Sequence, residues 1–90
     1  MKLKVRRTSQ FKRDIKKLIR GGKDIEKLLD VIEMLAEGQV LPIKYKDHPL
    51  RGEYKSKRDC HIEPDWILIY EIENIEIILY RTGSHAELFK

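Results

Sequence analysis

Residues 58–81, which read RDCHIEPDWILIYEIENIEIILYR, decide the fold. Within this stretch, 66–72 and 75–81 are rich in β-branched and aromatic residues, and the short polar break between them predicts a β-hairpin. A further strand is expected at 58–62, followed by a turn that contains Pro64. Apolar residues occupy both alternating positions of these runs, so we expect strands that are covered, at least in part, on both faces.

Outward from this region, the N-terminal half predicts one strand and a helical hairpin. Residues 2–7 alternate polar and apolar side chains, as a short strand does. Thr8 or Ser9 can cap a helix that ends at Gly21-Gly22, and a second helix is expected at about 24–37. The apolar stripes of the two helices consist of Phe11, Ile15, Leu18 and Ile19, and of Ile25, Leu28, Leu29, Ile32 and Leu35.

The segment between the helices and the hairpin carries weaker signals. Pro42 stops further helix, residues 43–52 predict a loop, and residues 53–57 predict a weak strand. The expected order is β-α-α-β-β-β-β, with a short helical turn at the C-terminus. This describes a single α+β domain over residues 1–90, in which a two-helix hairpin lies on one face of a mainly antiparallel sheet and the other face is partly open.

Charge is distributed unevenly along the chain. The formal net charge is +4, yet residues 1–20 contain nine Lys or Arg and one acid, and residues 41–60 contain six Lys or Arg and three acids. Two basic blocks favour a polyanionic partner, either RNA, DNA or an acidic protein segment. A merely solvated lysine-rich face has the same composition, so charge alone does not decide between these interpretations.

Nothing in the sequence indicates secretion or membrane insertion. No stretch approaches the roughly 18 consecutive apolar residues of a membrane span. The basic N-terminus is not followed by an apolar run, and the single cysteine, Cys60, cannot form an internal disulfide. We therefore expect a cytoplasmic protein without a membrane partner.

Histidines supply the most informative candidates for chemistry, and all three lie in the second half of the chain. His61 lies between Cys60 and Ile62 on a predicted strand, so it should point to the opposite face from these neighbours. Asp65 follows four residues later across a tight turn, so the two side chains could approach, and a carboxylate there could orient an imidazole. His48 lies in a predicted turn next to Pro49 and has little specificity by spacing alone.

The C-terminal stretch places a histidine in a helix-capping motif. Ser84 and Glu87 match the S-x-x-E capping box, which would make His85 the first residue of a short helix. The partial positive charge of a helix N-terminus disfavours imidazolium, so His85 is expected to accept a proton. Arg81 offers a permanent charge and a planar fork that suit a phosphorane.

These groups meet the requirements of RNA cleavage without a metal. A base removes the 2′-OH proton, the 2′-oxygen attacks the adjacent phosphorus, a cation stabilises the charge, and an acid protonates the departing 5′-oxygen. Zinc is a competing use of three histidines and an aspartate, but no His-x-His or H-E-x-x-H motif is present. Serine acyl chemistry is disfavoured because the chain has no G-x-S-x-G elbow.

Two motifs resemble a known family. The first comprises YKDHPLRG at 45–52 together with RDCHIEPDWILIY at 58–70, and the second is RTGSHAELF at 81–89. Together they resemble the YafQ branch of the RelE/ParE toxin superfamily. The similarity is dense over residues 45–89, whereas the N-terminal half agrees only in its pattern of a strand and a helical hairpin.

The resemblance implies the toxin of a type II toxin–antitoxin system with a small RelE-like, ribonuclease-type fold. Such toxins are endoribonucleases, called mRNA interferases, that cleave mRNA, typically on the ribosome, use no metal or other cofactor, and pair with a cognate antitoxin protein. The family's active-site positions correspond to His48, His61, Asp65, Arg81 and His85 in this sequence.

We expect His85 to transfer a proton and Arg81 to stabilise the phosphate, with Asp65 orienting a histidine and the remaining roles shared by His48 and His61. Further contacts with the substrate are expected from the basic segment and from two aromatic residues at family positions linked to activity. Phe89 is well placed to stack on a base, and packing of this C-terminal aromatic ring on the core is an equal alternative. The full set of expected substrate contacts is Lys46, Arg51, Lys55, Arg58, Trp66 and Phe89.

Two other function classes stay open at this point. The superfamily also contains ParE-type gyrase poisons, which act by binding a protein and lack this set of histidines. A non-catalytic RNA-binding module would need only the two basic blocks, because phosphate contacts by themselves give non-specific affinity.

Overall fold

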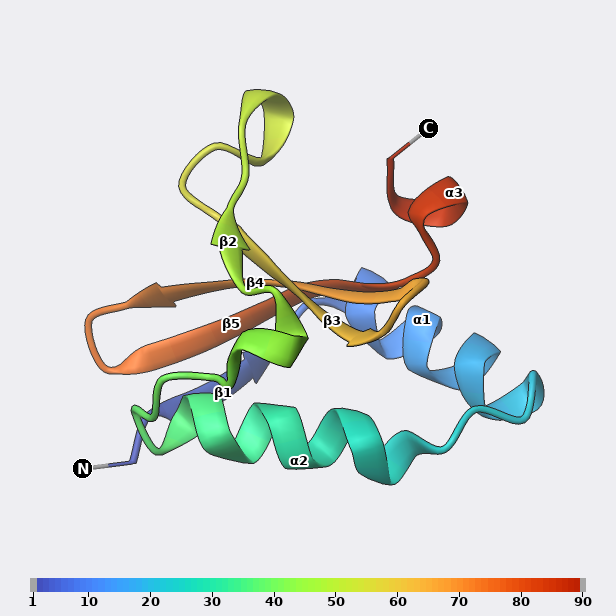
Figure 1. Cartoon of the computed structure of the whole chain (residues 1–90), viewed down its shortest axis with the longest axis horizontal. Helices are drawn as coiled ribbons and strands as arrows, with labels where there is room; N and C mark the ends of the chain where they lie inside the picture. The colour runs from blue at the N-terminus through green and yellow to red at the C-terminus, as the bar shows by residue number, and fades with distance from the viewer. Residues whose placement is uncertain (1, 90) are drawn as a thin grey trace.

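The chain forms a five-stranded sheet in the order β1-β5-β4-β3-β2, and the computed structural model describes residues 2–89. The two long helices lie on one side of the sheet, and the C-terminal helix lies on the other side (Figure 1). In chain order the elements are β1 (Lys4–Arg7), α1 (Ser9–Arg20), α2 (Ile25–Ala36), the 3-10 helix η1 (Ile43–Tyr45), β2 (His48–Pro49), the 3-10 helix η2 (Gly52–Tyr54), β3 (Arg58–Glu63), β4 (Trp66–Glu73), β5 (Glu76–Gly83) and α3 (His85–Leu88).

Side-chain caps set the starts of both long helices, as the sequence predicts. The hydroxyl of Thr8 accepts a hydrogen bond of 3.0 Å from the backbone N–H of Phe11, and Asp24 accepts one of 3.2 Å from Glu26. Gly22, with φ of +82°, turns the chain between α1 and α2. Within residues 2–89, no helix combines the length and apolar character needed to cross a membrane.

Strand pairing is mainly antiparallel, as predicted, because among the strands of residues 2–89 only β1 and β5 pair in parallel. The predicted weak strand at 53–57 is wrong. This segment contains η2 and a turn with positive φ at Ser56 (+80°), which an extended strand does not allow. The remaining strand of the sheet is β2, which lies inside the segment 43–52 that the sequence predicts as a loop. It pairs with the edge of β3.

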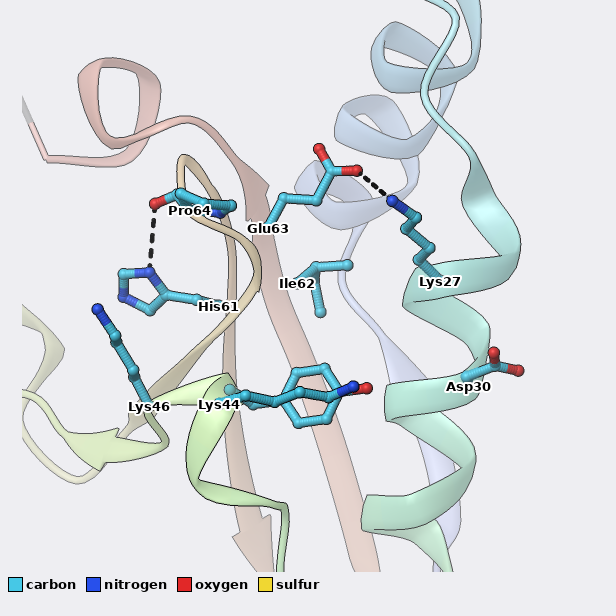
Figure 2. A pocket seen from close by; sticks show the side chains of 9 residues that line it. Lys27, Asp30, Lys44, Lys46, His61, Ile62, Glu63 and Pro64 are labelled. Atoms are coloured by element: carbon cyan, nitrogen blue, oxygen red, sulfur yellow. Dashed lines mark hydrogen bonds and ion pairs between the residues drawn. The ribbon is translucent and has the colours of Figure 1, made fainter.

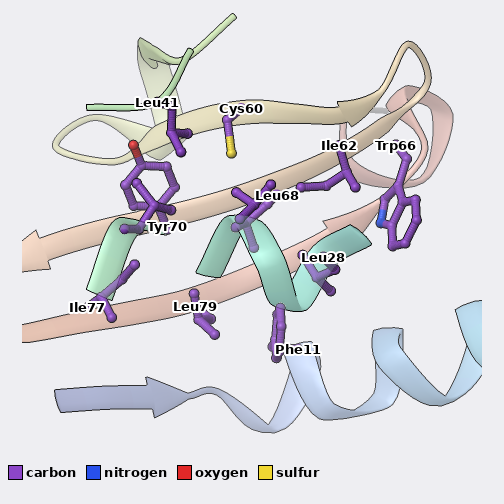
Figure 3. Close-up of a cluster of buried hydrophobic side chains, with 12 residues drawn as sticks. Phe11, Leu28, Leu41, Cys60, Ile62, Trp66, Leu68, Tyr70, Ile77 and Leu79 are labelled. Carbon is purple, nitrogen blue, oxygen red and sulfur yellow. The ribbon is translucent and has the colours of Figure 1, made fainter. Parts of the chain in front are cut away.

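The main hydrophobic core lies between the helices and the sheet (Figure 3). Alternate residues of each central strand point into it, together with the inner faces of α1 and α2. Its buried members are Phe11, Leu28, Val31, Leu35, Leu41, Cys60, Ile62, Trp66, Leu68, Tyr70, Ile77 and Leu79.

A smaller apolar cluster covers part of the opposite face of the sheet. Ile67, Ile69 and Leu88 are buried there, and Leu50 and Tyr54 pack against them from the segment around η2. The α3 helix and the η2 segment therefore border this face without closing it, and the prediction of strands partly covered on both sides is confirmed.

A bulge in β5 changes the direction of one important side chain. Tyr70 pairs with Leu79, but its neighbour Ile69 pairs with Arg81, so Tyr80 is an extra residue in β5. Because Ile69 and Tyr70 point to opposite faces, the bulge places Arg81 on the Ile69 face, away from the main core. Simple alternation would have grouped it with Leu79.

The short α3 helix is held by a complete capping box, as the sequence predicts. Ser84 accepts from the backbone N–H of Glu87, and the Glu87 carboxylate accepts from the backbone N–H of Ser84. Glu87 also forms an ion pair with Lys17 of α1. The hydrogen bonds from Lys17 and then from Ser84 lower the pKa of Glu87 from 4.5 to about 2.

Two adjacent leucines of α2 give a matched test of the core. Leu28 is fully buried, whereas its neighbour Leu29 is 49% exposed. We expect Leu28→Ala to lower the free energy of unfolding by about 2–5 kcal/mol, because it leaves a cavity in the core. Leu29→Ala should lower it by less than about 1 kcal/mol, because the helix propensity is kept and little packing is lost. Urea unfolding curves measure both, and equal losses would contradict the placement of α2.

The low pKa of Glu87 predicts a pH-dependent contribution to stability. The folded chain prefers the ionised carboxylate, so this contribution is complete above the ordinary pKa and is lost as the pH falls from about 4.5 to about 2. Urea unfolding should show wild type more stable than Glu87→Gln at neutral pH, and this difference should vanish through that acidic range. A difference that does not change with pH would contradict the role of the charged cap.

Candidate active site

The sheet register brings residues from four strands into one row on the face opposite the long helices. His48 of β2 pairs with Asp59 of β3, Asp59 pairs with Ile69 of β4, and Ile69 pairs with Arg81 of β5. Since neighbouring strands lie about 4.8 Å apart, side chains that are far apart in the sequence become neighbours. The bulge in β5 is required for Arg81 to take part in this row.

The three histidines gather beside this row and form what we call the histidine cluster. The ring centroids of His48 and His61 are 6.4 Å apart, and those of His61 and His85 are 5.5 Å apart. His61 and Gly83 pair with the same residue of β4, so the start of α3, two residues later, delivers His85 to His61. Among residues 2–89, no three His, Cys, Asp or Glu side chains are placed to hold a metal ion.

Each imidazole of the histidine cluster is held through Nδ1 by an oxygen atom that only accepts hydrogen bonds. Nδ1 therefore carries the proton in each ring, and Nε2 is the nitrogen that remains for proton exchange. The three pairs are His48 with the Lys46 carbonyl at 2.8 Å, His61 with the Pro64 carbonyl at 3.3 Å, and His85 with Asp65 Oδ1 at 3.0 Å.

Asp65 contacts a different histidine from the one that its sequence position suggests. The turn after β3 directs its carboxylate toward His85, where Oδ1 accepts from the backbone N–H at 3.0 Å as well as from the ring. These two hydrogen bonds, the backbone one first, lower the pKa of Asp65. The His61 ring is held instead by the Pro64 carbonyl of the same turn, so the histidine that Asp65 orients is His85.

Asp59 is a buried carboxylate beneath the histidine cluster that the sequence analysis did not single out. It is 3% exposed, and its Oδ1 lies 3.0 Å from His48 Nδ1, within ion-pair distance. The His48 ring N–H is not aligned with this oxygen for a hydrogen bond, so Oδ1 is left without a hydrogen-bond partner among the described residues. Burial raises the pKa of Asp59, while the charges of the histidines act in the opposite direction. Its position two residues before His61 on one strand was the signal for a shared face.

Asp14 is a second buried acid that the sequence analysis missed. It is 7% exposed and lies on α1, where it accepts hydrogen bonds from Arg81 Nε at 3.0 Å and Nη2 at 3.1 Å, and from the backbone N–H of Thr82 at 3.1 Å. This bidentate pair fixes the guanidinium of Arg81 and leaves Nη1 free of Asp14. Asp14 falls on the buried stripe of α1 with Phe11, and this helical spacing was the available signal.

The two aromatic residues predicted to contact substrate differ in their exposure to solvent. Phe89 is 38% exposed, with its ring 5.9 Å from His85 and packed edge-on against Tyr54 at 5.8 Å. Trp66 is 1% exposed, and its indole N–H donates to the Thr82 hydroxyl in the core. The prediction that Trp66 contacts RNA directly is therefore wrong. Side chains alternate between the two faces of β4, and that of Trp66 lies on the face toward the helices.

The four basic residues predicted to contact substrate are not brought together. Lys46 lines the same cleft as His61. Arg58 has the opposite strand parity from His61, and its guanidinium binds the carboxylate of Asp47 at 3.2 Å. Arg51 and Lys55 are exposed in the segment around η2.

Known proteins share this fold and much of this sequence. Residues 3–90 match the family model described as "Bacterial toxin of type II toxin-antitoxin system, YafQ". The chain is 43% identical over 83 residues to the mRNA interferase toxin YafQ of Escherichia coli, and the match covers 91% of this chain and 90% of that protein.

Solved structures agree with this match and confirm the α+β fold. The toxin in the Escherichia coli DinJ-YafQ toxin-antitoxin complex has a TM-score of 0.92 at 40% identity, with all of both chains covered. A metal-bound toxin from Helicobacter pylori has a TM-score of 0.91 at 43% identity and covers 97% of this chain and 99% of its own. Because family model, sequence and fold agree over almost the whole chain, it belongs to the YafQ family of bacterial toxins of type II toxin–antitoxin systems.

Proposed function

We propose that this chain is an mRNA interferase, an endoribonuclease toxin that cleaves mRNA and is held inactive by a cognate antitoxin. In this proposal residues 1–90 act as a single toxin domain, in the cytoplasm and on mRNA bound to the ribosome. The observation that carries it is the meeting of three imidazoles, each held through Nδ1, on one partly open face of the sheet, with Arg81 in the same row by strand register. The names of the Escherichia coli relative and of its antitoxin complex support the same activity and partner.

RNA can be cleaved by these side chains through attack of its own 2′-hydroxyl. A neutral imidazole removes the 2′-OH proton, and the 2′-oxygen forms a bond to the adjacent phosphorus. The bond from phosphorus to the 5′-oxygen then breaks, and a protonated imidazole supplies the proton that the leaving oxygen needs. The products are a 2′,3′-cyclic phosphate and a new 5′-hydroxyl, so atoms and charges balance.

His85 and Arg81 take the central roles in this scheme. The Nδ1 of His85 donates to Asp65, which fixes the ring so that Nε2 carries out proton transfer. Arg81, fixed on two nitrogens by Asp14, directs Nη1 at the phosphorane and stabilises its added charge. His61 and His48 share the second proton transfer and the contact with the phosphate.

Asp59 is assigned a positioning role beneath the histidines. A carboxylate that is buried without a hydrogen bond on one oxygen costs stability, and its proximity to His48 Nδ1 stabilises the imidazolium form during proton transfer. Asp59 therefore acts through His48 and does not touch the substrate.

Toxicity and mRNA cleavage should depend on the same two side chains. Tightly controlled expression of wild type in bacteria should arrest growth and produce discrete new 5′ ends in a reporter mRNA. His85→Ala should lower the cleavage rate by about 10²–10⁴-fold because proton transfer is lost. Arg81→Ala should lower it by about 10²–10³-fold because the charge on the phosphate is no longer stabilised.

The control for this experiment is Lys12→Ala, an exposed lysine of α1 outside the histidine cluster, which should arrest growth like wild type. Arrest without mRNA cuts would contradict the nuclease proposal and favour a toxin that acts by binding a protein. Variants of His85 and Arg81 that stay fully toxic would contradict the catalytic scheme.

Asp59→Asn should separate activity from stability. The amide keeps the shape of the side chain but removes the buried charge, so we expect kcat to fall at least about tenfold with KM little changed, because only a transition-state interaction is lost. The Tm should stay equal or rise, because a buried ion with an unsatisfied oxygen is removed. A lower Tm together with an unchanged kcat would show that Asp59 supports the fold alone.

A further inference from the structure

A cleft of about 410 Å³ opens beside the histidine cluster, between α2, η1 and β3. His61 lines this cleft as well as belonging to the cluster, so the cleft continues the candidate active site (Figure 2). Binding sites for small molecules commonly have volumes of roughly 300–1,000 Å³, so there is room for a single nucleotide.

The cleft exists because β2 is short. It pairs only with Arg58 and Asp59, so the outer edge of β3 from residue 60 to residue 63 has no strand partner within the described part of the chain. The η1 segment approaches this edge without joining the sheet, and the space left between them and α2 is the cleft.

The acidic residues along the cleft do not oppose an anionic ligand. Glu63 is neutralised by two cations, Lys23 at 3.0 Å and Lys27 at 2.8 Å. In Figure 2 the Glu63 and Lys27 side chains point toward each other, and the carboxylate of Asp30 points away from His61.

Two exposed lysines line the cleft, and one aromatic ring lies between them in the sequence. Lys44 and Lys46 are exposed, and in Figure 2 the Lys46 side chain extends toward the His61 ring. Tyr45 is half-buried against the core, with Lys44 Nζ 5.1 Å from its ring centroid. Ile62 and Pro64 supply further apolar lining. Cations beside an aromatic ring are the groups with which proteins bind single-stranded RNA.

We propose that this cleft is a second RNA subsite, which binds the nucleotide next to the one whose phosphate is cleaved. In the free chain the Lys44 ammonium lies over the Tyr45 ring, and the RNA displaces it, so that the base stacks on Tyr45 and its phosphate lies between Lys44 and Lys46. This orients the chain of the RNA as it enters the histidine cluster. This inference rests on the proposed function, because it assigns to the cleft a part of the same substrate.

The experiment compares two RNA lengths. We would measure kcat/KM for a dinucleotide, which fills only the histidine cluster, and for a tetranucleotide, which also reaches the cleft. The variants are Tyr45→Ala and Lys44→Ala, and Lys12→Ala on α1 is the matched control outside the cleft. We expect Tyr45→Ala to lower kcat/KM for the tetranucleotide about tenfold, as the loss of one base–aromatic stack does, and to change the dinucleotide value less than about twofold.

Lys44→Ala should lower kcat/KM for the tetranucleotide selectively as well, but by a smaller factor. Because the Lys44 side chain is exposed, this variant tests the cleft even if Tyr45→Ala fails to fold. Equal losses for both substrates, or no loss for either, would overturn the subsite. Failure of wild type to cleave either RNA would instead count against catalysis by the histidine cluster without the ribosome, and the cleft is then tested by binding of a non-cleavable RNA.

A binding measurement keeps the two proposals separate. Titration of the whole chain with a non-cleavable 2′-O-methyl tetranucleotide should shift the amide NMR signals of Tyr45 and Lys46, whereas the corresponding dinucleotide should not. If an acidic peptide shifts these signals and the tetranucleotide does not, the cleft binds protein and the RNA subsite is wrong.

Discussion

The backbone register of β2, β3, β4 and β5 is the constraint on which the rest of the structure depends. It places His48, Asp59 and Arg81 in one row, and it does so only because the bulge at Tyr80 shifts the end of β5 by one residue. A slip of one residue would turn every side chain of a strand to the other face. The same slip would expose the core and dismantle the site, so packing of the core also enforces the geometry of the histidine cluster.

Two buried acids support the site, and one of them lowers the stability of the fold. Asp14 is fully used, since it accepts hydrogen bonds from Arg81 and from the backbone of Thr82, and it ties α1 to the end of β5. Asp59 has one oxygen without a hydrogen bond, and burial raises its pKa. An ionisable group whose burial destabilises the folded state, and which lies next to functional side chains, is characteristic of an active site.

Elements with a strong local signal were predictable. The helix caps at Thr8 and Asp24, the hairpin of β4 and β5 and the capping box of α3 follow from side-chain chemistry over a few residues. The second strand was not predictable in this way. Residues 53–57 resemble a strand in composition, but the edge of β3 is occupied by the two residues of β2, and pairing between distant segments decides which is extended.

The sequence by itself determined the family, the order of most elements and the set of chemical groups, because motifs and periodicity are local properties of the chain. Only the tertiary structure decided which groups meet. It paired Asp65 with His85 and Asp14 with Arg81, buried Trp66 in the core, and placed Asp59 beneath the histidines. These outcomes depend on strand register, one bulge and the packing of a helix against a strand end, which are set by contacts between residues far apart in the chain.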